Sequence, residues 1–267
     1  MRTVRNTVIM IAVCFTLFMG NAMQVSAEPS DEKETVQDTR PDYTIYVNTA
    51  LNCVTVMQPN QQGDLVPVKA MVCSCGAEDK ITPAGTFQTT DYYDWRLMID
   101  DTYGRYAVRF YKKILFHSVP YLTNTPDSLD WEAYNLLGQG ASHGCVRLSV
   151  EDAKWIYDNC KVGTTVVVYA DAENPGPLGK PEAIKIDGNL PYRNWDPTDT
   201  DLNNPWHNPA SLQQYPIGSV EQFDYIGYAD RYIDVKNAYG YDRDALYAHY
   251  MNFGMKEKRI AHFDNYQ

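Results

Sequence analysis

The sequence is short of basic residues, with 23 lysines and arginines against 34 aspartates and glutamates and a net charge of −11. Proteins that bind nucleic acids neutralise phosphates with a surplus of lysine and arginine, so this balance argues against such a partner. Apolar runs are scarce too: beyond residues 8–20, no segment is long and apolar enough to cross a bilayer. A net negative charge favours solubility but names no substrate.

The single long apolar run lies at the N-terminus and predicts a signal peptide over residues 1–27. Arg2 and Arg5 form its positive start, residues 8–20 its apolar centre, and Val25-Ser26-Ala27 a small-residue cleavage site. An uncleaved membrane anchor is the alternative, although the run is short for a span. Either form predicts a protein that is secreted or held in the cell envelope. Cleavage removes two arginines and takes the net charge from −11 to −13.

Cysteine is also scarce, and Cys14 leaves with the signal peptide. The five that remain are Cys53, Cys73, Cys75, Cys145 and Cys160. An odd number in an exported protein indicates one free thiol and one or two disulfides, and we expect Cys145 to be the free one. The expected disulfide joins Cys73, at the end of a core strand, to Cys160, which faces inward on a predicted helix. Cys53 with Cys75 is a second candidate, and the connectivity stays open.

Residues 28–42 are polar and charged, which predicts a disordered lead-in. Residues 43–170 predict a mainly β domain, since segments rich in β-branched residues alternate with turns. The expected strands cover 43–47, 53–57, 66–73, 106–110, 114–117 and 165–169, with a further strand after the turn at 82–87. One helix is expected over residues 150–160, because Ser149 begins a capping-box pattern and apolar residues follow at helical spacing.

Residues 171–216 are rich in proline, asparagine and aspartate, which predicts a linker or an extended wrap. Asp199, Asp201 and Asn203 resemble the start of a calcium loop. However, Ala210 stands where an EF-hand needs a bidentate glutamate, so a solvated linker is favoured.

Residues 217–267 predict a small helical segment. A capping box at 219–222 precedes a helix over 225–239, and Asp242 caps a last helix that ends at Gly254. Leu246, Tyr250 and Phe253 are expected to share one face of this helix. The segment resembles one copy of a short helical repeat of exported bacterial proteins.

The residues that carry chemistry lie in the run Ser142-His143-Gly144-Cys145-Val146-Arg147. A thiol is a poor nucleophile and a thiolate a good one, so a working cysteine needs a base or a positive charge nearby. His143 lies two residues before Cys145, and His117 lies upstream at the end of a strand. The spacing alone does not choose between these bases. Gly144 permits close approach of the backbone to a substrate, and Arg147 supplies a charge suited to a carboxylate.

Three other interpretations of these residues carry less weight. Either histidine, taken alone, is typical of a satisfied core residue, and only the combined motif favours catalysis. Two histidines and a cysteine can bind zinc, but His143 and Cys145 are two residues apart and no fourth ligand is evident, so we expect no metal. Cys73-Ser74-Cys75 has C-x-C spacing in place of the C-x-x-C of redox proteins.

The motif from Ser142 to Arg147 resembles the signature of the L,D-transpeptidase catalytic domain, also called the YkuD domain. Thr82-Pro83-Ala84-Gly85-Thr86-Phe87 is similar to the TPxGxF turn of that family, and Phe116-His117-Ser118 to its upstream histidine segment. The resemblance covers residues 43–170. The gap between His117 and His143 is longer than in many members, and the insert at 120–139 is expected to form a lid or wall of the site.

The resemblance implies a β-sandwich-like fold, no cofactor, and peptidoglycan stem peptides as the substrate. Cys145 is then the nucleophile and His117 the base, oriented by the Ser118 carbonyl. The backbone of His143, Gly144 and Cys145 forms the oxyanion site, and Arg147 binds substrate. D-Ala leaves a tetrapeptide stem, and a second stem takes the acyl group in a 3→3 cross-link during cell wall biogenesis. Water as acceptor (an L,D-carboxypeptidase), a protein amine (wall anchoring), and a non-catalytic wall-binding protein stay open as alternatives.

Overall fold

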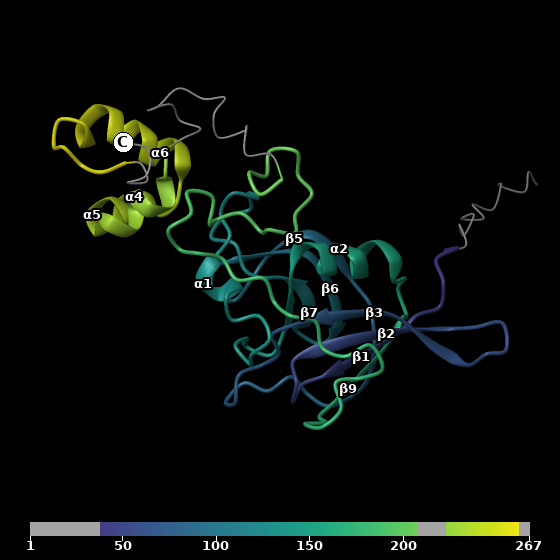
Figure 1. Ribbon diagram of the computed structural model, residues 1–267. Helices are drawn as coiled ribbons and strands as arrows, with labels where there is room; N and C mark the ends of the chain where they lie inside the picture. The colour runs from purple at the N-terminus through teal and green to yellow at the C-terminus, as the bar shows by residue number, and fades with distance from the viewer. Residues whose placement is uncertain (1–37, 208–222, 262–267) are drawn as a thin grey trace, which may run out of the picture. The chain divides into compact units, whose positions relative to one another are not determined.

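The computed structural model describes residues 38–207 and 223–261 (Figure 1). The predicted signal peptide, residues 28–37 of the lead-in, and the predicted capping box at 219–222 lie outside the described residues. Within the described ranges, no helix combines the length and the apolar character needed to cross a membrane.

Two mixed β-sheets form the domain that begins at β1. The first sheet has the strand order β3-β2-β1-β9-β4, and the second the order β5-β6-β7-β8. The bounds of the first sheet are β1 Thr44–Asn48, β2 Cys53–Pro59, β3 Leu65–Val72, β4 Gly85–Gln88 and β9 Thr165–Tyr169. Those of the second are β5 Tyr92–Leu97, β6 Tyr103–Tyr111, β7 Ile114–Ser118 and β8 Val146–Leu148. The prediction of a mainly β, β-sandwich-like fold is confirmed, and each expected strand is present.

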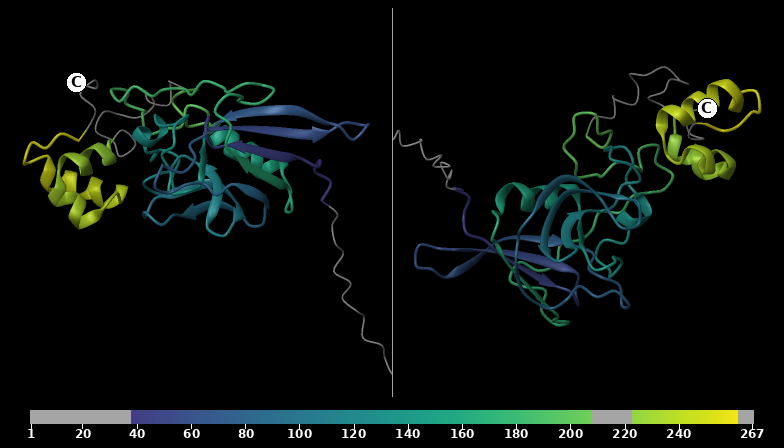
Figure 2. Two further views of the ribbon diagram at one scale, coloured as in Figure 1. Left: turned by 90° about the horizontal axis from the view of Figure 1, so that it is seen from below. Right: turned by 180° about the vertical axis from the view of Figure 1, so that it is seen from behind.

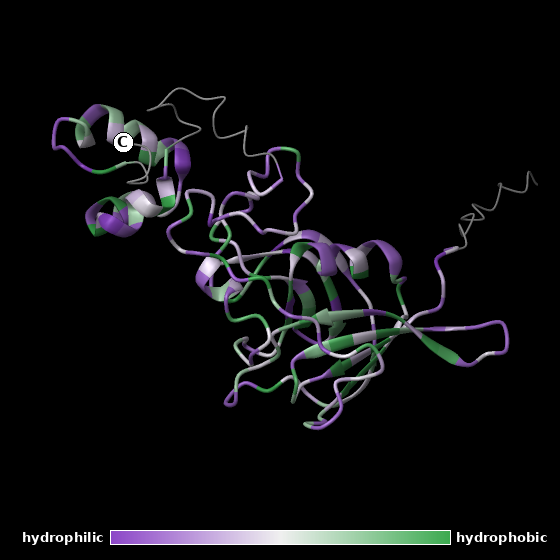
Figure 3. Cartoon of the chain, viewed as in Figure 1, coloured by the Kyte–Doolittle hydropathy of each residue, from purple (hydrophilic) through white to green (hydrophobic). Residues whose placement is uncertain are grey.

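A single core joins the two sheets. On β1, Ile45 lies opposite Val56 and Val166, and Val47 lies opposite Val54 and Val168, so β-branched residues form continuous buried rows. Side chains of β6, β7 and β8 pack against these rows in the same cluster. Figure 3 shows the apolar colour concentrated on these strands. The views in Figure 2 show the β2–β3 hairpin projecting beyond the sheet.

The predicted helix after the cysteine motif is α2, Val150–Asn159. Its cap is confirmed, because the Ser149 side chain accepts a hydrogen bond from the Asp152 backbone. The carboxylate of Asp196 accepts a second bond at this end, from Val150 N at 2.8 Å. The helix packs on β6 and β7, and its Ala153 and Ile156 join the core between the two sheets.

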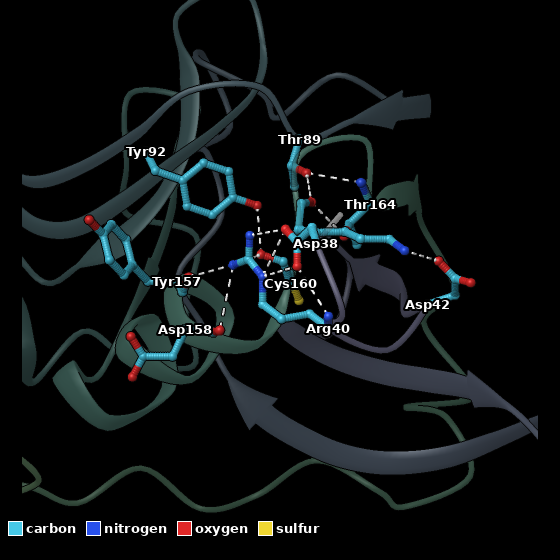
Figure 4. Close-up of polar contacts among 10 residues, drawn as sticks. Asp38, Arg40, Asp42, Thr89, Tyr92, Tyr157, Asp158, Cys160 and Thr164 are labelled. Carbon is cyan, nitrogen blue, oxygen red and sulfur yellow. Dashed lines mark hydrogen bonds and ion pairs between the residues drawn. The ribbon is translucent and has the colours of Figure 1, made fainter. Parts of the chain in front are cut away.

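The other end of α2 is held by residues that were expected to be disordered (Figure 4). Arg40 donates to the Cys160 carbonyl at 2.7 Å, at the C-terminus of the helix. Asp38 in turn accepts three hydrogen bonds from the Arg40 guanidinium. Cations are favourable where helix carbonyls lack partners. Residues 38–42 therefore belong to the folded domain, and the prediction of disorder is wrong for them.

Of the two predictions for residues 171–207, the extended wrap describes what is seen. The segment has no strand or regular helix, yet Asp196 and Asn204 are fully buried. Asp199, the first residue of the calcium-like pattern, forms an ion pair with Arg105 at 2.6 Å. Asn204 Nδ2 donates to the carbonyls of Asp196 and Asp199, so hydrogen bonds from a side chain to the backbone replace regular structure here.

The C-terminal residues form four short helical elements, which are α4 Tyr225–Arg231, α5 Ile233–Tyr239, α6 Arg243–His249 and the π-helix η2 Tyr250–Gly254. The continuous helix expected over 225–239 is wrong, because the backbone leaves helical geometry at Tyr232. The Asp242 cap is confirmed by its bond from Ala245 N. Phe253 does not share the buried face of Leu246, because a π turn shifts the side chains that follow it.

The expected disulfides are wrong for the described chain. All five cysteines between residues 38 and 261 are free. The sulfur of Cys73 lies 3.7 Å from that of Cys75, while Cys160 ends α2 and Cys53 donates to the Pro175 carbonyl. Cys73 and Cys160 are both buried, but their sulfurs do not form a disulfide.

Candidate active site

A cavity of about 390 Å³ opens at the end of the second sheet. Its lining includes four of the residues that the sequence singled out: His117, His143, Cys145 and Arg147. Ser118 is fully buried behind His117. The structure therefore brings together residues that lie up to 30 positions apart in the chain.

Parallel pairing of β7 with β8 explains this convergence. His117 lies opposite Arg147, and Phe116 lies opposite Val146. Because side chains alternate along a strand, Cys145 and Arg147 point to the same face as His117. The opposite face carries Phe116 and Val146 into the core. The sheet thus presents the polar residues to the cavity and anchors them with apolar neighbours.

The other edge of β8 pairs with the segment that contains the two neighbouring cysteines. Ser74 N donates to the Arg147 carbonyl and Arg147 N donates to the Ser74 carbonyl, both at 2.9 Å. Ala141 N and Ser142 N donate to the Cys75 carbonyl. The C-x-C segment is therefore a structural support of the cysteine motif.

His117 is buried and neutral. Its Nδ1 lies 2.6 Å from the Ser118 carbonyl oxygen. A carbonyl only accepts, so Nδ1 carries the proton and Nε2 is left as the basic nitrogen. Burial, followed by the charge of Arg147, lowers the pKa of His117 to about 4.

Cys145 is the half-buried cysteine of the set. Its sulfur makes a long 3.7 Å contact to the Lys113 carbonyl. Burial raises the pKa of the Cys145 thiol, and the positive charge of Arg147 opposes the shift without cancelling it. The resting pair is therefore a thiol and a neutral imidazole.

Ser142 holds the backbone on both sides of Gly144. Its hydroxyl accepts from Gly144 N at 3.0 Å and donates to the Cys145 carbonyl at 2.5 Å. The Gly144 N–H is engaged by the Ser142 hydroxyl in this structure, and its use for an oxyanion stays a prediction. Gly144 has a φ of +113°, and a Cβ there would lie 2.9 Å from Ile114, so glycine is needed for the backbone path. The roles of the His143 and Cys145 N–H groups stay predictions.

Thr82, in the turn that resembles the TPxGxF segment, fixes the same loop from the other side. Its hydroxyl donates to the Gly144 carbonyl at 2.9 Å and accepts from Gly76 N at 2.9 Å. Motif residues far apart in the chain thus meet through one buried side chain.

Asp100 is a site residue that sequence reasoning missed. Its Oδ2 lies 3.8 Å from His143 Nδ1 and 3.9 Å from Arg147. Although burial opposes the shift, hydrogen bonds from Thr102 lower the pKa of Asp100, which keeps the carboxylate ionised. No local sequence pattern around Asp100 predicts its contacts with His143 and Arg147. Arg147 also donates to the Ala141 carbonyl at 3.1 Å.

The wall of the cavity differs from the expected one. The β5–β6 hairpin supplies a continuous stretch of it from Arg96 to Asp100. From the insert at 120–139, Pro120 alone of the described residues lines the cavity. The insert instead buries Tyr121, Leu129 and Tyr134 in a separate cluster, with the short helix α1, Trp131–Tyr134. Its apolar side chains gain more from this burial than from facing water.

The described ranges contain no cluster of side chains that could bind a metal ion. No three histidine, cysteine, aspartate or glutamate side chains gather between residues 38 and 207 or between 223 and 261. A cysteine and a neutral histidine on one sheet face are the parts needed for nucleophilic acyl transfer.

Residues 42–168 match the family model described as YkuD, the L,D-transpeptidase catalytic domain. The resemblance seen in the motifs is confirmed over this segment. The Bacillus subtilis (strain 168) protein named "Putative L,D-transpeptidase YciB" is 37% identical over 108 residues, 38% of this chain and 55% of that protein. The chain thus spans about half the length of this curated relative.

Solved structures of L,D-transpeptidases are also similar to the chain. One from Mycobacterium tuberculosis H37Rv is 25% identical, with a TM-score of 0.38. The match covers 48% of this chain and 58% of the chain in that structure. One from Mycobacterium smegmatis is 22% identical, with a TM-score of 0.39. The match covers 49% of this chain and 59% of the chain in that structure.

Proposed function

We propose that this protein is an exported L,D-transpeptidase that acts on peptidoglycan stem peptides through Cys145. The observation that carries the proposal is the state of His117, a buried neutral imidazole whose proton is held on Nδ1 by the Ser118 carbonyl. This leaves Nε2 as a base in the cavity that Cys145 also lines.

In the first half-reaction, a tetrapeptide stem occupies the cavity. Cys145 loses its proton to His117 Nε2 while the sulfur attacks the carbonyl of the third, diamino-acid residue. The tetrahedral intermediate collapses to a thioester. The proton on His117 passes to the leaving amine, and D-Ala departs.

In the second half-reaction, the side-chain amine of another stem attacks the thioester. His117 takes a proton from this amine, the thiol leaves, and a 3→3 cross-link is formed. Bond energy is conserved through the thioester, so no cofactor is required. Backbone N–H groups of His143 and Cys145 are the proposed oxyanion donors.

Incubation of the purified protein with disaccharide tetrapeptides, followed by mass spectrometry, tests the proposal. The expected products are free D-Ala and a cross-linked dimer, both absent with Cys145→Ala. Loss of D-Ala without a dimer would instead identify an L,D-carboxypeptidase, and transfer to a protein amine a wall-anchoring enzyme.

A non-catalytic wall-binding protein predicts a different result. The proposed enzyme should form one covalent adduct with a carbapenem, located on Cys145 by peptide mapping. Binding to peptidoglycan with no adduct and no product would contradict the cysteine mechanism.

A further inference from the structure

The charge around the cavity is opposite in sign to that of the whole chain. Four cationic residues line it: Arg96, Arg109, Lys113 and Arg147. Asp100 is the one acid among the described residues of the lining, although the chain as a whole carries a net charge of −11. A cleft lined by one sign of charge attracts ligands of the opposite sign.

Two of these cations already have acidic partners. Arg109 donates from Nε to Asp91 at 2.8 Å and from another nitrogen to the Tyr93 hydroxyl. Arg147 lies 3.9 Å from Asp100, and its side chain is only 12% exposed. Neither guanidinium is therefore well placed as the main ligand of an incoming carboxylate.

Arg96 and Lys113 differ from these two arginines in their exposure and in their ion pairing with acidic residues. Both are exposed, and across residues 38–207 and 223–261 no carboxylate forms an ion pair with either of them. The guanidinium of Arg96 lies 4.8 Å from the centre of the Tyr93 ring, a contact that leaves its hydrogen-bond donors available. Lys113 lies in the β6–β7 turn, and its carbonyl is the one that Cys145 Sγ contacts.

We propose that Arg96 and Lys113 determine specificity by binding internal carboxylates of the donor stem, so that stems with free carboxylates react in preference to amidated ones. The inference rests on the function proposed above. Conversion of a carboxylate to a primary amide removes its charge and changes little else, so the selection acts through charge. The backbone carbonyl of Lys113 contacts the thiol, and Lys113 lines the same cavity, so its ammonium can bind a carboxylate close to the acylated residue.

The experiment compares two tetrapeptide stems, one with free internal carboxylates and one with these carboxylates amidated. For two exposed ion pairs we expect the wild type to favour the free stem about tenfold in kcat/KM, mostly through KM. Lys113→Gln and Arg96→Gln should each reduce the preference about threefold, and the double variant should abolish it. Raised salt should weaken the preference of the wild type, because exposed charges are screened.

Lys112→Gln is the matched control, because Lys112 is an exposed neighbour whose ammonium lies over the Tyr111 ring and does not line the cavity. It should keep the preference of the wild type. Calorimetric binding of both stems to Cys145→Ala gives a readout that does not need turnover. A binding preference without turnover would support this inference and contradict the proposed function. Turnover with equal kcat/KM for both stems, or equal effects of Lys112→Gln and Lys113→Gln, would overturn the inference alone.

Discussion

The imidazole Nδ1 of His117 lies 2.6 Å from the carbonyl oxygen of Ser118, the residue that follows it in β7. The contact is made by the backbone, so the side chain at position 118 is not needed for it. The Ser118 hydroxyl has other partners, since it accepts from Arg105 N and donates to the Val119 carbonyl. The orientation of the base is thus built into the strand end.

The acid limb of the pH–rate profile should lie at an unusually low pH. Burial lowers the pKa of His117 to about 4, so the base is unprotonated throughout the neutral range. We expect kcat/KM for acylation to stay flat as pH falls to about 5 and to drop near 4. A carbapenem acylation rate measured from pH 3.5 to 8 checks this. A limb at the ordinary histidine pKa of about 6.5 would show that His117 is solvated in the free enzyme.

The same histidine should make stability depend on pH. Between the unfolded pKa of about 6.5 and the folded pKa of about 4, the unfolded state binds the extra proton. Stability from the neutral imidazole is therefore present above pH 6.5 and lost as pH falls to 4. The free energy of unfolding of the wild type, relative to His117→Gln, should drop by about 3 kcal/mol over this range. Urea unfolding of both proteins at pH 7, 5.5 and 4 measures it; parallel curves would contradict the burial effect.

Much of this fold is predictable from local patterns. β-branched alternation indicates the rows that Ile45 and Val47 form with their neighbours, and the Ser149 pattern indicates the start of α2. Strand β8 could not be predicted, because three residues are too few to show a period. The helix break at Tyr232 could not be predicted, because no proline or glycine marks it.

Contacts between distant parts of the chain could not be predicted in the same way. Arg40 reaches the Cys160 carbonyl across 120 positions, and Asp196 reaches Val150 across 46. Asp100, between β5 and β6, meets Arg147 of β8, although β7 separates β6 from β8 in the sheet. Such pairings depend on how sheets stack, and a motif of six residues carries no information about them.

Cys145 should react slowly with alkylating agents at neutral pH. Its pKa is raised by burial, and the thiolate is the reactive form. The iodoacetamide rate should rise steadily from pH 7 through pH 9 and beyond, with peptide mapping to assign the modified residue. Cys145→Ala provides the background, since the other four described cysteines are buried. A fast rate that is already constant at pH 7 would indicate a thiolate–imidazolium pair.

Ser142→Ala should damage turnover more than folding. The hydroxyl joins Gly144 N to the Cys145 carbonyl, and a lost buried partner costs about 1–3 kcal/mol. We expect kcat to fall by about two- to thirteenfold if half of that amount is lost from the transition state. Ser74→Ala is the control, because this equally buried hydroxyl donates to the Leu136 carbonyl, away from the loop. It should lower the melting temperature similarly and leave kcat near that of the wild type. A higher kcat for Ser142→Ala would mean that the released Gly144 N–H serves the oxyanion.

Arg40→Ala should weaken the domain without touching the chemistry. The guanidinium caps the last carbonyls of α2, with its strongest bond to Cys160 O at 2.7 Å, and charge-assisted caps of this kind contribute about 1–2 kcal/mol. Because α2 packs on β6 and β7, a loosened helix end should lower the urea midpoint of the whole domain. Arg40→Lys keeps the positive charge at the helix end but loses the two-pronged contact with Asp38, so it should recover part of the stability. Carbapenem acylation at 25 °C should be unchanged in both variants, and a slower acylation rate in Arg40→Ala would show that this end of α2 also positions the cysteine loop.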